Sequence, residues 1–308
     1  YTDFQDYGWS SDKHCQKIYQ GYTTKIEKDV VISTWQSIYK MPRKYFDQFG
    51  CVIGDEAHMF KAKSLTGIMT KMHHCKYRFG LTGTLDGTQT HQLVLEGLFG
   101  AVEKVVTTKQ LIDKNTLAKL KIKCVILKHQ EIREKMTYAE ELEYLVTNEK
   151  RTDFVVNLLR HLNGNTLCLF QLVEKHGKIL NDKMKGSENV YFVYGGTDTS
   201  ERENIRGLVE KHTKSTTIAS YGTFSTGINI RNIHNIVLAS PSKSKIRVLQ
   251  SIGRGLRTSS DKDSVLVYDI ADDISYNERR NFTLNHFTER LNIYNEEQFD
   301  YDISKVKL

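Results

Sequence analysis

The chain has 308 residues, of which 39% are hydrophobic and 26% are charged, and its formal net charge is +7. This length is enough for two domains with buried cores, and the sequence has no run of about 18 apolar residues that would indicate a membrane span. The moderate positive charge is compatible with a polyanionic partner but does not require one.

The cysteines and the first residue bear on the setting of the protein. The five cysteines are far apart in the sequence and form no CxxC pair. Neither a zinc site nor a disulfide framework is therefore indicated, and we expect a cytoplasmic protein in a reducing cell interior. Because Tyr1 is not a methionine and the residues after it do not resemble a signal peptide, we expect the sequence to open inside a longer natural chain.

Short apolar runs recur along the chain, separated by segments of helical length and spacing such as 175–184 and 201–212. Runs this short and apolar are typical of buried parallel strands. The runs are 29–32, 51–54, 78–81, 123–127, 166–170, 190–194, 217–220, 235–238 and 264–268. The alternation of strands and helices predicts an α/β fold with mainly parallel sheets.

A polar, lysine-rich segment divides these elements into two groups. We expect a first domain over residues 1–107, a linker over 108–121 and a second domain over 122–308. The second domain contains a complete series of strands. The first shows only three clear strands, which is few for a free-standing α/β domain, and we therefore expect it to be truncated at its N-terminus.

Two adjacent carboxylates, Asp55 and Glu56, follow the apolar run 51–54. In open α/β sheets, ligands bind at the carboxyl ends of the strands. One carboxylate at that edge could hold a hydrated magnesium ion, and the next could orient and deprotonate a water that attacks a γ-phosphate. The alternative is an ordinary acidic strand end, since Asp-Glu pairs are common.

Small hydroxyl residues and a glycine follow the next apolar run, at Thr82, Gly83 and Thr84. They predict a tight, hydrogen-bonded turn that could sense the neighbouring carboxylates. Taken alone, a plain Thr-Gly turn explains the same residues.

A third feature is a predicted helix near residue 250. Gln250, Arg254 and Arg257 recur at i, i+4 and i+7, which places them on one helix face. Gly253 and Gly255 lower the helix propensity there and allow close approach of another surface. Two arginines on one face suit a phosphate group, although a solvated basic face would have the same pattern.

A fourth feature is the loop 220–230, which follows a strand and is rich in hydroxyls and glycines. Such a loop suits contacts with phosphates or ribose, but by itself it indicates little.

Along the chain, the carboxylate pair, the Thr-Gly turn, the loop 220–230 and the helix near residue 250 occur in the order of motifs II, III, V and VI of the superfamily 2 helicases. The sequence resembles this superfamily over nearly its whole length. Residues 32–38 resemble motif Ib, and residues 169–170 stand where motif IV would fall. The segments 49–58, 79–83, 220–227 and 243–257 further resemble phage branch-migration helicases of the UvsW type. The resemblance implies two RecA-like domains, with motifs Ib, II and III in the first and motifs IV, V and VI in the second.

The resemblance also implies catalytic roles. Asp55 would coordinate magnesium through water, and Glu56 would activate the hydrolytic water. Arg254 and Arg257 would act as arginine fingers from the second domain, with Gln250 beside them. In phosphoryl transfer such a finger contributes roughly 10³ to 10⁵ in rate.

Further residues would bind nucleotide, couple hydrolysis to movement, or hold the nucleic-acid backbone. The implied nucleotide-binding residues are His58, Gly227 and Asn229, of which His58 would also link the ATP site to the domain interface. The implied coupling residues are Thr82, Gly83 and Thr84. The implied nucleic-acid contacts are Thr34, Gln36 and Thr223. Asn229 departs from the commoner Gly-x-Asp pattern of the family. This departure argues only against a carboxylate role at position 229.

Together these roles imply an ATP-dependent DNA helicase or translocase that uses ATP and Mg²⁺ and acts as a monomer on DNA. The resemblance to the phage helicases implies branched or forked DNA as the substrate, in recombination, repair or replication restart. An RNA helicase or a restriction-type translocase of the same superfamily remains an alternative.

The sequence has no P-loop of the form G-x-x-x-x-G-K-[ST], whose amides and lysine hold the phosphates in such motors. Its one Gly-Lys pair, Gly177 and Lys178, fails the pattern at both ends. Leu172 stands at the position of the first glycine, five residues before Gly177, and Ile179 stands at the position of the serine or threonine. The sequence is therefore either part of a complete enzyme, which the retained motifs favour, or an ATP-inactive module that binds nucleic acid or docks a partner. As part of an enzyme, this chain alone is expected to be inactive.

Overall fold

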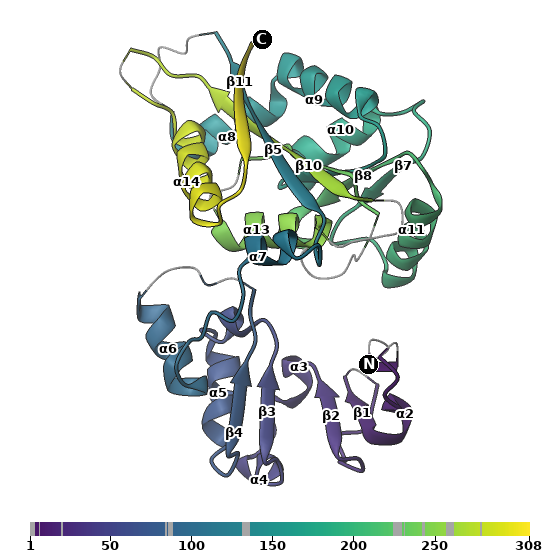
Figure 1. Cartoon of the computed structure of the whole chain (residues 1–308), viewed down its shortest axis with the longest axis vertical. Helices are drawn as coiled ribbons and strands as arrows, with labels where there is room; N and C mark the ends of the chain where they lie inside the picture. Colours follow the sequence, from purple (N-terminus) through teal and green to yellow (C-terminus); the bar gives the residue numbers. More distant parts are fainter. Residues whose placement is uncertain are drawn as a thin grey trace. The chain divides into compact units, whose positions relative to one another are not determined.

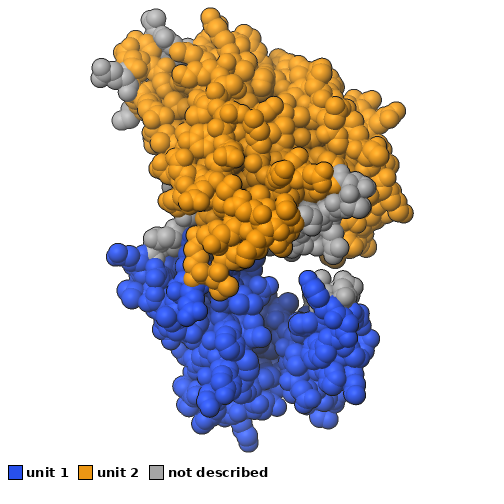
Figure 2. Space-filling model, in the orientation of Figure 1, with its two compact units in different colours: residues 1–103 blue, residues 104–308 orange. Residues whose placement is uncertain are grey.

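The computed structural model describes residues 4–5, 7–19, 21–83, 85, 89–130, 136–223, 230, 232–241, 244–256, 262–277 and 279–308. The chain divides into two compact units, Tyr1–Glu103 and Lys104–Leu308, which Figure 2 shows in separate colours. Each unit is an α/β structure, as the strand-helix alternation of the sequence predicts.

Unit 1 contains two small parallel sheets, in which β1 pairs with β2 and β3 pairs with β4 (Figure 1). Its elements in chain order are α2 (Ser11–His14), β1 (Cys15–Ile18), β2 (Val30–Ser33), α3 (Trp35–Ile38), α4 (Arg43–Phe46), β3 (Cys51–Gly54), η1 (Ala57–Met59), α5 (Lys63–Lys71), β4 (Tyr77–Gly80) and α6 (Gln89–Phe99). The core of the unit lies between the β3–β4 pair and helices α5 and α6, and includes Phe60, Met69 and Leu95.

Unit 2 is built on a seven-stranded sheet in the order β11-β5-β10-β9-β6-β8-β7, and every neighbouring pair is parallel. Its elements are α7 (Thr108–Asp113), β5 (Lys119–Lys128), α8 (Tyr138–Thr147), α9 (Glu149–His161), β6 (Asn165–Phe170), η2 (Val173–Gly177), α10 (Lys178–Lys183), β7 (Val190–Val193), α11 (Thr199–Lys211), β8 (Ser215–Ser220), β9 (Asn235–Leu238), α13 (Lys245–Gly255), β10 (Ser264–Asp273), α14 (Phe282–Glu296) and β11 (Tyr301–Lys307).

Helices cover both faces of this sheet. Along β6, Leu167 and Leu169 belong to a core shared with α11, α13 and α14, whereas Cys168 and Phe170 belong to a core shared with α9 and α10. Because side chains alternate across a strand, a sheet with two covered faces needs a nearly continuous apolar run in each central strand. This is why the central strands were visible in the sequence.

All nine predicted strands are present, within a few residues of their expected ends. Two strands were not predicted. In β11, only Tyr301 and Val306 are even half-buried, and the other side chains of the strand are exposed, so it lacks the apolar run of a central strand. The short β1 has two polar residues between Cys15 and Ile18.

The boundary between the units differs from the one expected. It falls between Glu103 and Lys104, and the segment 108–121 forms α7 and the first residues of β5 inside unit 2 instead of a linker. Thr107 and Gln110 form a capping box at the start of α7. Ile112, together with residues 117 and 120, packs against the core of unit 2. The lysines of the segment suggested a solvated connection, but its apolar residues decide its place.

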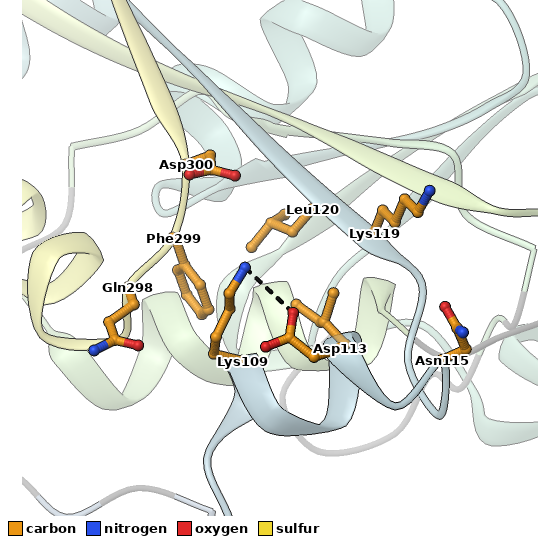
Figure 3. A pocket seen from close by; sticks show the side chains of 9 residues that line it. Lys109, Asp113, Asn115, Lys119, Leu120, Gln298, Phe299 and Asp300 are labelled. Carbon is orange, nitrogen blue, oxygen red and sulfur yellow. Dashed lines mark ion pairs between the residues drawn. The ribbon is translucent and has the colours of Figure 1, made fainter.

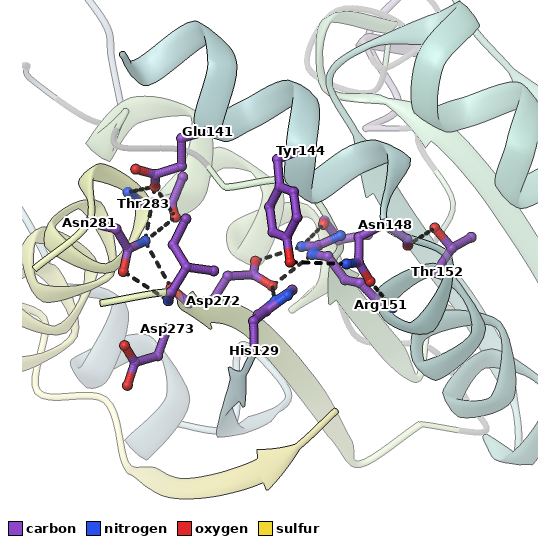
Figure 4. A network of polar contacts seen from close by, with 12 residues as sticks. His129, Glu141, Tyr144, Asn148, Arg151, Thr152, Asp272, Asp273, Asn281 and Thr283 are labelled. Carbon is purple, nitrogen blue, oxygen red and sulfur yellow. Dashed lines mark hydrogen bonds and ion pairs between the residues drawn. The ribbon is translucent and has the colours of Figure 1, made fainter. Parts of the chain in front are cut away.

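Two buried ionic clusters hold unit 2 together, and Figure 4 shows the first. In it, Asp272 at the end of β10 accepts from Arg151 Nε at 2.8 Å and from Arg151 Nη2 at 2.9 Å, and lies 2.9 Å from His129 Nε2. Burial raises the pKa of Asp272, but Arg151 and His129 outweigh it and lower the pKa to about 2. In the second cluster, Asp269 accepts from Arg290 and from the hydroxyl of Tyr294.

Candidate nucleotide and nucleic-acid site

The carboxylate pair lies directly after β3, as the sequence predicts. Asp55 is exposed, and its Oδ1 accepts a hydrogen bond from the backbone N–H of Glu56 at 2.9 Å. Asp55 Oδ2 makes no hydrogen bond within the described part of the chain, and this free, exposed oxygen suits a hydrated magnesium ion. The donor set therefore fits the ion that the resemblance implies.

Glu56 has a left-handed backbone, with φ of 49° and ψ of 50°. This conformation is uncommon for a residue other than glycine and costs of the order of 1 kcal/mol or more. It ends the strand abruptly and starts the short helix η1. Such outliers concentrate at functional sites, where the surrounding structure holds them in place.

His58 joins the carboxylate pair to the turn after β4. It is buried, and its Nδ1 lies 3.0 Å from Thr82 Oγ1 and 3.3 Å from Glu56 Oε2. The backbone supports the same arrangement, since Ala57 N donates to Leu81 O at 2.8 Å and Leu81 N donates to Gly54 O at 2.8 Å. Glu56, which is expected to activate water, and Thr82, which is expected to couple hydrolysis, thus both contact His58.

Two glycines allow these strand ends to pack closely. Gly54 and Gly80 are register partners in the β3–β4 pair. A Cβ on Gly54 would lie 2.8 Å from the ring of Phe60, and a Cβ on Gly80 would lie 2.9 Å from the ring of Phe99. The two rings contact each other edge to face, with their centroids 5.0 Å apart. A larger residue at either glycine would displace Phe60 or Phe99.

The residues of the motif Ib segment are accessible. Thr34 is the N-cap residue of α3, its hydroxyl lies 3.0 Å from Ser37 Oγ, and both Thr34 and Gln36 are exposed. The turn residue Gly83 is also exposed, whereas Thr84 lies outside the described residues.

In unit 2, Gln250 and Arg254 lie on α13, as predicted, and both are partly exposed. Arg257 lies outside the described residues. Of the two glycines that flank Arg254, Gly255 does permit a close approach, because a Cβ there would lie 2.4 Å from Ile236 Cδ1. Gly253 has open space around its Cα, so close packing does not explain it.

The C-terminal end of α13 is held by a residue that sequence reasoning missed. Lys262 is buried, and its Nζ donates to Gly255 O at 2.8 Å. Burial lowers the pKa of Lys262 to about 8. An ammonium group at this end of a helix interacts favourably with the helix dipole.

The loop expected to contact phosphates or ribose is described only in part. Thr223 is buried and its Oγ1 lies 2.8 Å from Ser220 Oγ, so its hydroxyl faces the end of β8 rather than solvent. Its expected contact with nucleic acid therefore requires either its backbone or a local rearrangement. Gly227 and Asn229 lie outside the described residues.

A pocket of about 410 Å³ was not predicted and lies in unit 2 (Figure 3). Its lining residues are Lys109, Ile112, Asp113, Asn115, Lys119, Leu120, Gln298, Phe299 and Asp300. Lys109 and Asp113 pair at 3.3 Å. The pocket contains none of the motif residues and has side chains of both charges.

The described residues show neither a membrane-spanning helix nor a cluster of metal ligands. None of the helices there has the length and apolar character needed to cross a membrane. Three or more His, Cys, Asp or Glu side chains nowhere gather there in a way that could hold a metal ion.

Comparison with known proteins agrees with this geometry. Residues 1–87 match the family described as type III restriction enzyme, res subunit, and residues 149–259 match the helicase conserved C-terminal domain. The ATP-dependent DNA helicase uvsW of Enterobacteria phage T4 is 34% identical over 328 aligned residues, which cover 99% of this chain and 65% of the relative. The chain thus spans a little under two thirds of that protein.

Solved structures lead to the same family. The crystal structure of T4 UvsW aligns with a TM-score of 0.54 at 32% identity, over 99% of this chain and 64% of that one. Saccharomyces cerevisiae Dbp5, bound to RNA and ADP BeF3, shares the fold with a TM-score of 0.61 at 14% identity, over 96% of this chain and 70% of that one. With two RecA-like domains built on parallel sheets and with helicase motifs at their strand ends, the chain belongs to the superfamily 2 helicases and is similar to UvsW.

Proposed function

We propose that the complete protein is an ATP-dependent DNA helicase or translocase of the UvsW type, which acts on branched or forked DNA in recombination, repair or replication restart. The observation that carries the proposal is the cluster of Glu56, His58 and Thr82 at the ends of two adjacent parallel strands. The 34% identity to a phage DNA helicase over 99% of the chain supports it.

In this proposal, unit 1 supplies the carboxylates for hydrolysis. Magnesium, when bound with ATP, would neutralise charge on the phosphates, and Asp55 would hold it through water. Glu56 would orient the attacking water and accept its proton. Its left-handed backbone and the contact with His58 keep the carboxylate at the strand end, where a nucleotide would lie.

Unit 2 would supply positive charge to the transferred phosphate through Arg254 and Arg257, with Gln250 on the same helix. The packing of Gly255 on Ile236 and its contact with Lys262 fix the helix that carries Arg254. Guanidinium groups suit this role because they present several donors in a rigid plane. Gly227 and Asn229 are proposed to contact the nucleotide.

Thr34 and Gln36 are proposed to hold the DNA backbone in unit 1, and the turn that contains Thr223 is proposed to hold it in unit 2. Phosphate contacts of this kind track a strand without reading its sequence. We further propose that the protein acts as a monomer on DNA. The preference for branched or forked DNA rests on the similarity to UvsW.

ATP hydrolysis also needs a phosphate-binding loop, and this chain contains no such sequence. We propose that the complete protein provides one and that this chain alone does not hydrolyse ATP. The competing function is an ATP-inactive module that binds nucleic acid or docks a partner. The intact carboxylate pair argues against it, because such a module would have no need to keep Glu56 in a strained conformation.

A substrate panel tests the proposal. ATP hydrolysis by the complete protein is measured with single-stranded, duplex, forked and four-way DNA, and with single-stranded RNA of the same sequence. We expect the largest stimulation with forked or four-way DNA. Equal stimulation by RNA would contradict the DNA assignment, and equal stimulation by all DNA forms would contradict the preference for branches.

A further inference from the structure

A chain of buried hydrogen bonds centred on Ser240 lies at the carboxyl edge of the seven-stranded sheet. Ser240 follows β9 and is 2% exposed. Its Oγ accepts from the backbone N–H of Gln171 at 3.1 Å and lies 2.8 Å from His176 Nδ1. Its carbonyl accepts from the hydroxyl of Tyr221 at 3.1 Å. Ser240 therefore connects the segment after β6 with the segment after β8.

His176 lies in an unusual turn on the first side of this chain. Residues Val173–Gly177 form a π-helix, in which Gly177 N donates to Leu172 O at 2.9 Å. Single π turns are rare and are frequent at functional sites. Burial, reinforced by the charge of Arg151, lowers the pKa of His176 to about 3. The ring is therefore neutral at physiological pH and can hold Ser240 without bringing a charge into the core.

Tyr221 lies on the other side, directly after β8, where residues 221–223 are helical. Its ring is 3% exposed, and its hydroxyl reaches Ser240 as described. Thr223 is held in turn by Ser220, through the contact between their hydroxyls. The segment thus leaves β8 in a conformation set by buried contacts, before any nucleic acid is bound.

The backbone at Ser240 is itself anchored. Arg151 Nη2 donates to Ala239 O at 2.8 Å, and the same guanidinium pairs with Asp272. Ala239 N and Ser240 N both donate to Leu169 O, at 3.0 and 3.3 Å. Ser240 is therefore a fixed point against which Tyr221 can be placed.

We propose that Tyr221, Ser240 and His176 form a positioning relay that holds residues 222–223 in the conformation that contacts the nucleic-acid backbone. The inference rests on the proposed function, since it assigns this segment to a nucleic-acid contact. None of the three residues is catalytic. They act through the segment, and their loss weakens the response to DNA without changing hydrolysis in its absence.

The cleanest test removes one hydroxyl. In Tyr221→Phe the ring remains and the hydroxyl that donates to Ser240 O is removed. The matched control is Tyr294→Phe, which also loses one buried hydroxyl hydrogen bond in unit 2, to Asp269 Oδ2 at 2.7 Å. Both variants of the complete protein are compared by amide hydrogen exchange at residues 221–223 and by the DNA concentration that gives half-maximal stimulation of ATP hydrolysis.

One buried hydrogen bond typically contributes a factor of about five in an equilibrium. We expect Tyr221→Phe to raise both the exchange rate of this segment and the half-saturating DNA concentration by about that factor, with hydrolysis in the absence of DNA unchanged. Tyr294→Phe should lower the thermal midpoint at least as much and leave both readouts at the wild-type value.

A second pair of variants tests the far end of the relay. His176→Asn retains a polar group near the position of Nδ1, whereas His176→Leu fills the space without it. We expect His176→Leu to raise the half-saturating DNA concentration and His176→Asn to restore most of the wild-type response. A purely structural histidine would show no such rescue, because both variants would differ from the wild type only in stability.

The outcomes separate the relay from the proposed function. If exchange at residues 221–223 responds to Tyr221→Phe no more than to Tyr294→Phe, the relay is overturned. If exchange responds but the half-saturating DNA concentration does not, the assignment of the segment to DNA contact is overturned. If exchange responds and the wild-type protein shows no stimulation by any DNA, the relay stands as a structural device and the proposed function fails.

Discussion

The Nδ1 atom of His58 lies 3.0 Å from the hydroxyl of Thr82 and 3.3 Å from a carboxylate oxygen of Glu56. The imidazole thus connects the strand end that carries the proposed water-activating residue with the neighbouring strand end. A displacement of Glu56 on hydrolysis would move His58 and so alter its contact with Thr82. This is a physical route by which the state of the nucleotide can reach the turn after β4.

Replacement of Thr82 by valine should uncouple the two strand ends. The substitution keeps the shape and removes the hydroxyl that His58 contacts. We expect the stimulation of ATP hydrolysis by DNA to fall about fivefold, the effect of one buried hydrogen bond, while the KM for ATP changes little. Thr66→Val, which removes a hydroxyl that donates to Phe60 O at 2.8 Å, is the control and should retain the stimulation. Equal loss in both variants would contradict the role of Thr82.

Removal of the arginines should abolish hydrolysis without unfolding unit 2. We expect Arg254→Ala and Arg257→Ala each to lower kcat by about a thousandfold, in the range seen for arginine fingers. Arg206→Ala, at a partly exposed arginine of α11 that pairs with Glu203, should leave kcat unchanged. Circular dichroism and the thermal midpoint report folding separately. A variant that keeps half of the wild-type kcat would remove its arginine from the proposed site.

The buried carboxylate of Asp272 should make unit 2 sensitive to acid. Its pKa is lowered to about 2 in the folded protein, against about 3.9 in an unfolded chain. Because the folded pKa is the lower one, the stabilisation is complete above about pH 5 and is lost as the pH falls through this interval. Asp272→Asn should be less stable at pH 7, by about 3 kcal/mol, because Arg151 stays buried without its partner. Its stability should also fall less between pH 5 and pH 2, as measured by urea unfolding.

DNA binding should weaken steeply as salt rises. Contacts between basic side chains and phosphates release counterions, so the logarithm of the binding constant should fall linearly with the logarithm of the salt concentration. Fluorescence anisotropy of a labelled forked DNA at a series of salt concentrations measures this slope for the complete protein. A flat response would show that the protein does not track the phosphate backbone.

The central strands could be predicted from the sequence because both faces of the sheet are covered, which leaves an unbroken apolar run at each strand. The edge strand β11 could not be predicted, since most of its side chains are exposed and charged residues interrupt its apolar ones. The segment 108–121 was misjudged for a related reason. Its lysines are at the surface, while Ile112 packs against the core of unit 2.

The residues of the candidate site likewise divide into those that the sequence could predict and those that it could not. Asp55, Glu56 and Thr82 were identified because they follow apolar runs directly. The contacts of Glu56 and Thr82 with His58 then required only that the two strands be neighbours. The Ser240 relay had no such signal. Its members follow three different strands as isolated residues, and only the order of strands in the sheet brings them together.

The most direct measurement is steady-state ATP hydrolysis by the complete protein and by its Glu56→Gln variant, with and without forked DNA. We expect the wild type to be strongly stimulated by the DNA. The variant should bind ATP with similar affinity and hydrolyse it about 10² to 10⁴ times more slowly, the usual effect of losing a general base. Glu103→Gln, at an exposed position of the same unit, should match the wild type. Undiminished hydrolysis by Glu56→Gln, or a wild type that DNA does not stimulate, would contradict the assignment of this chain to a DNA-driven ATPase motor.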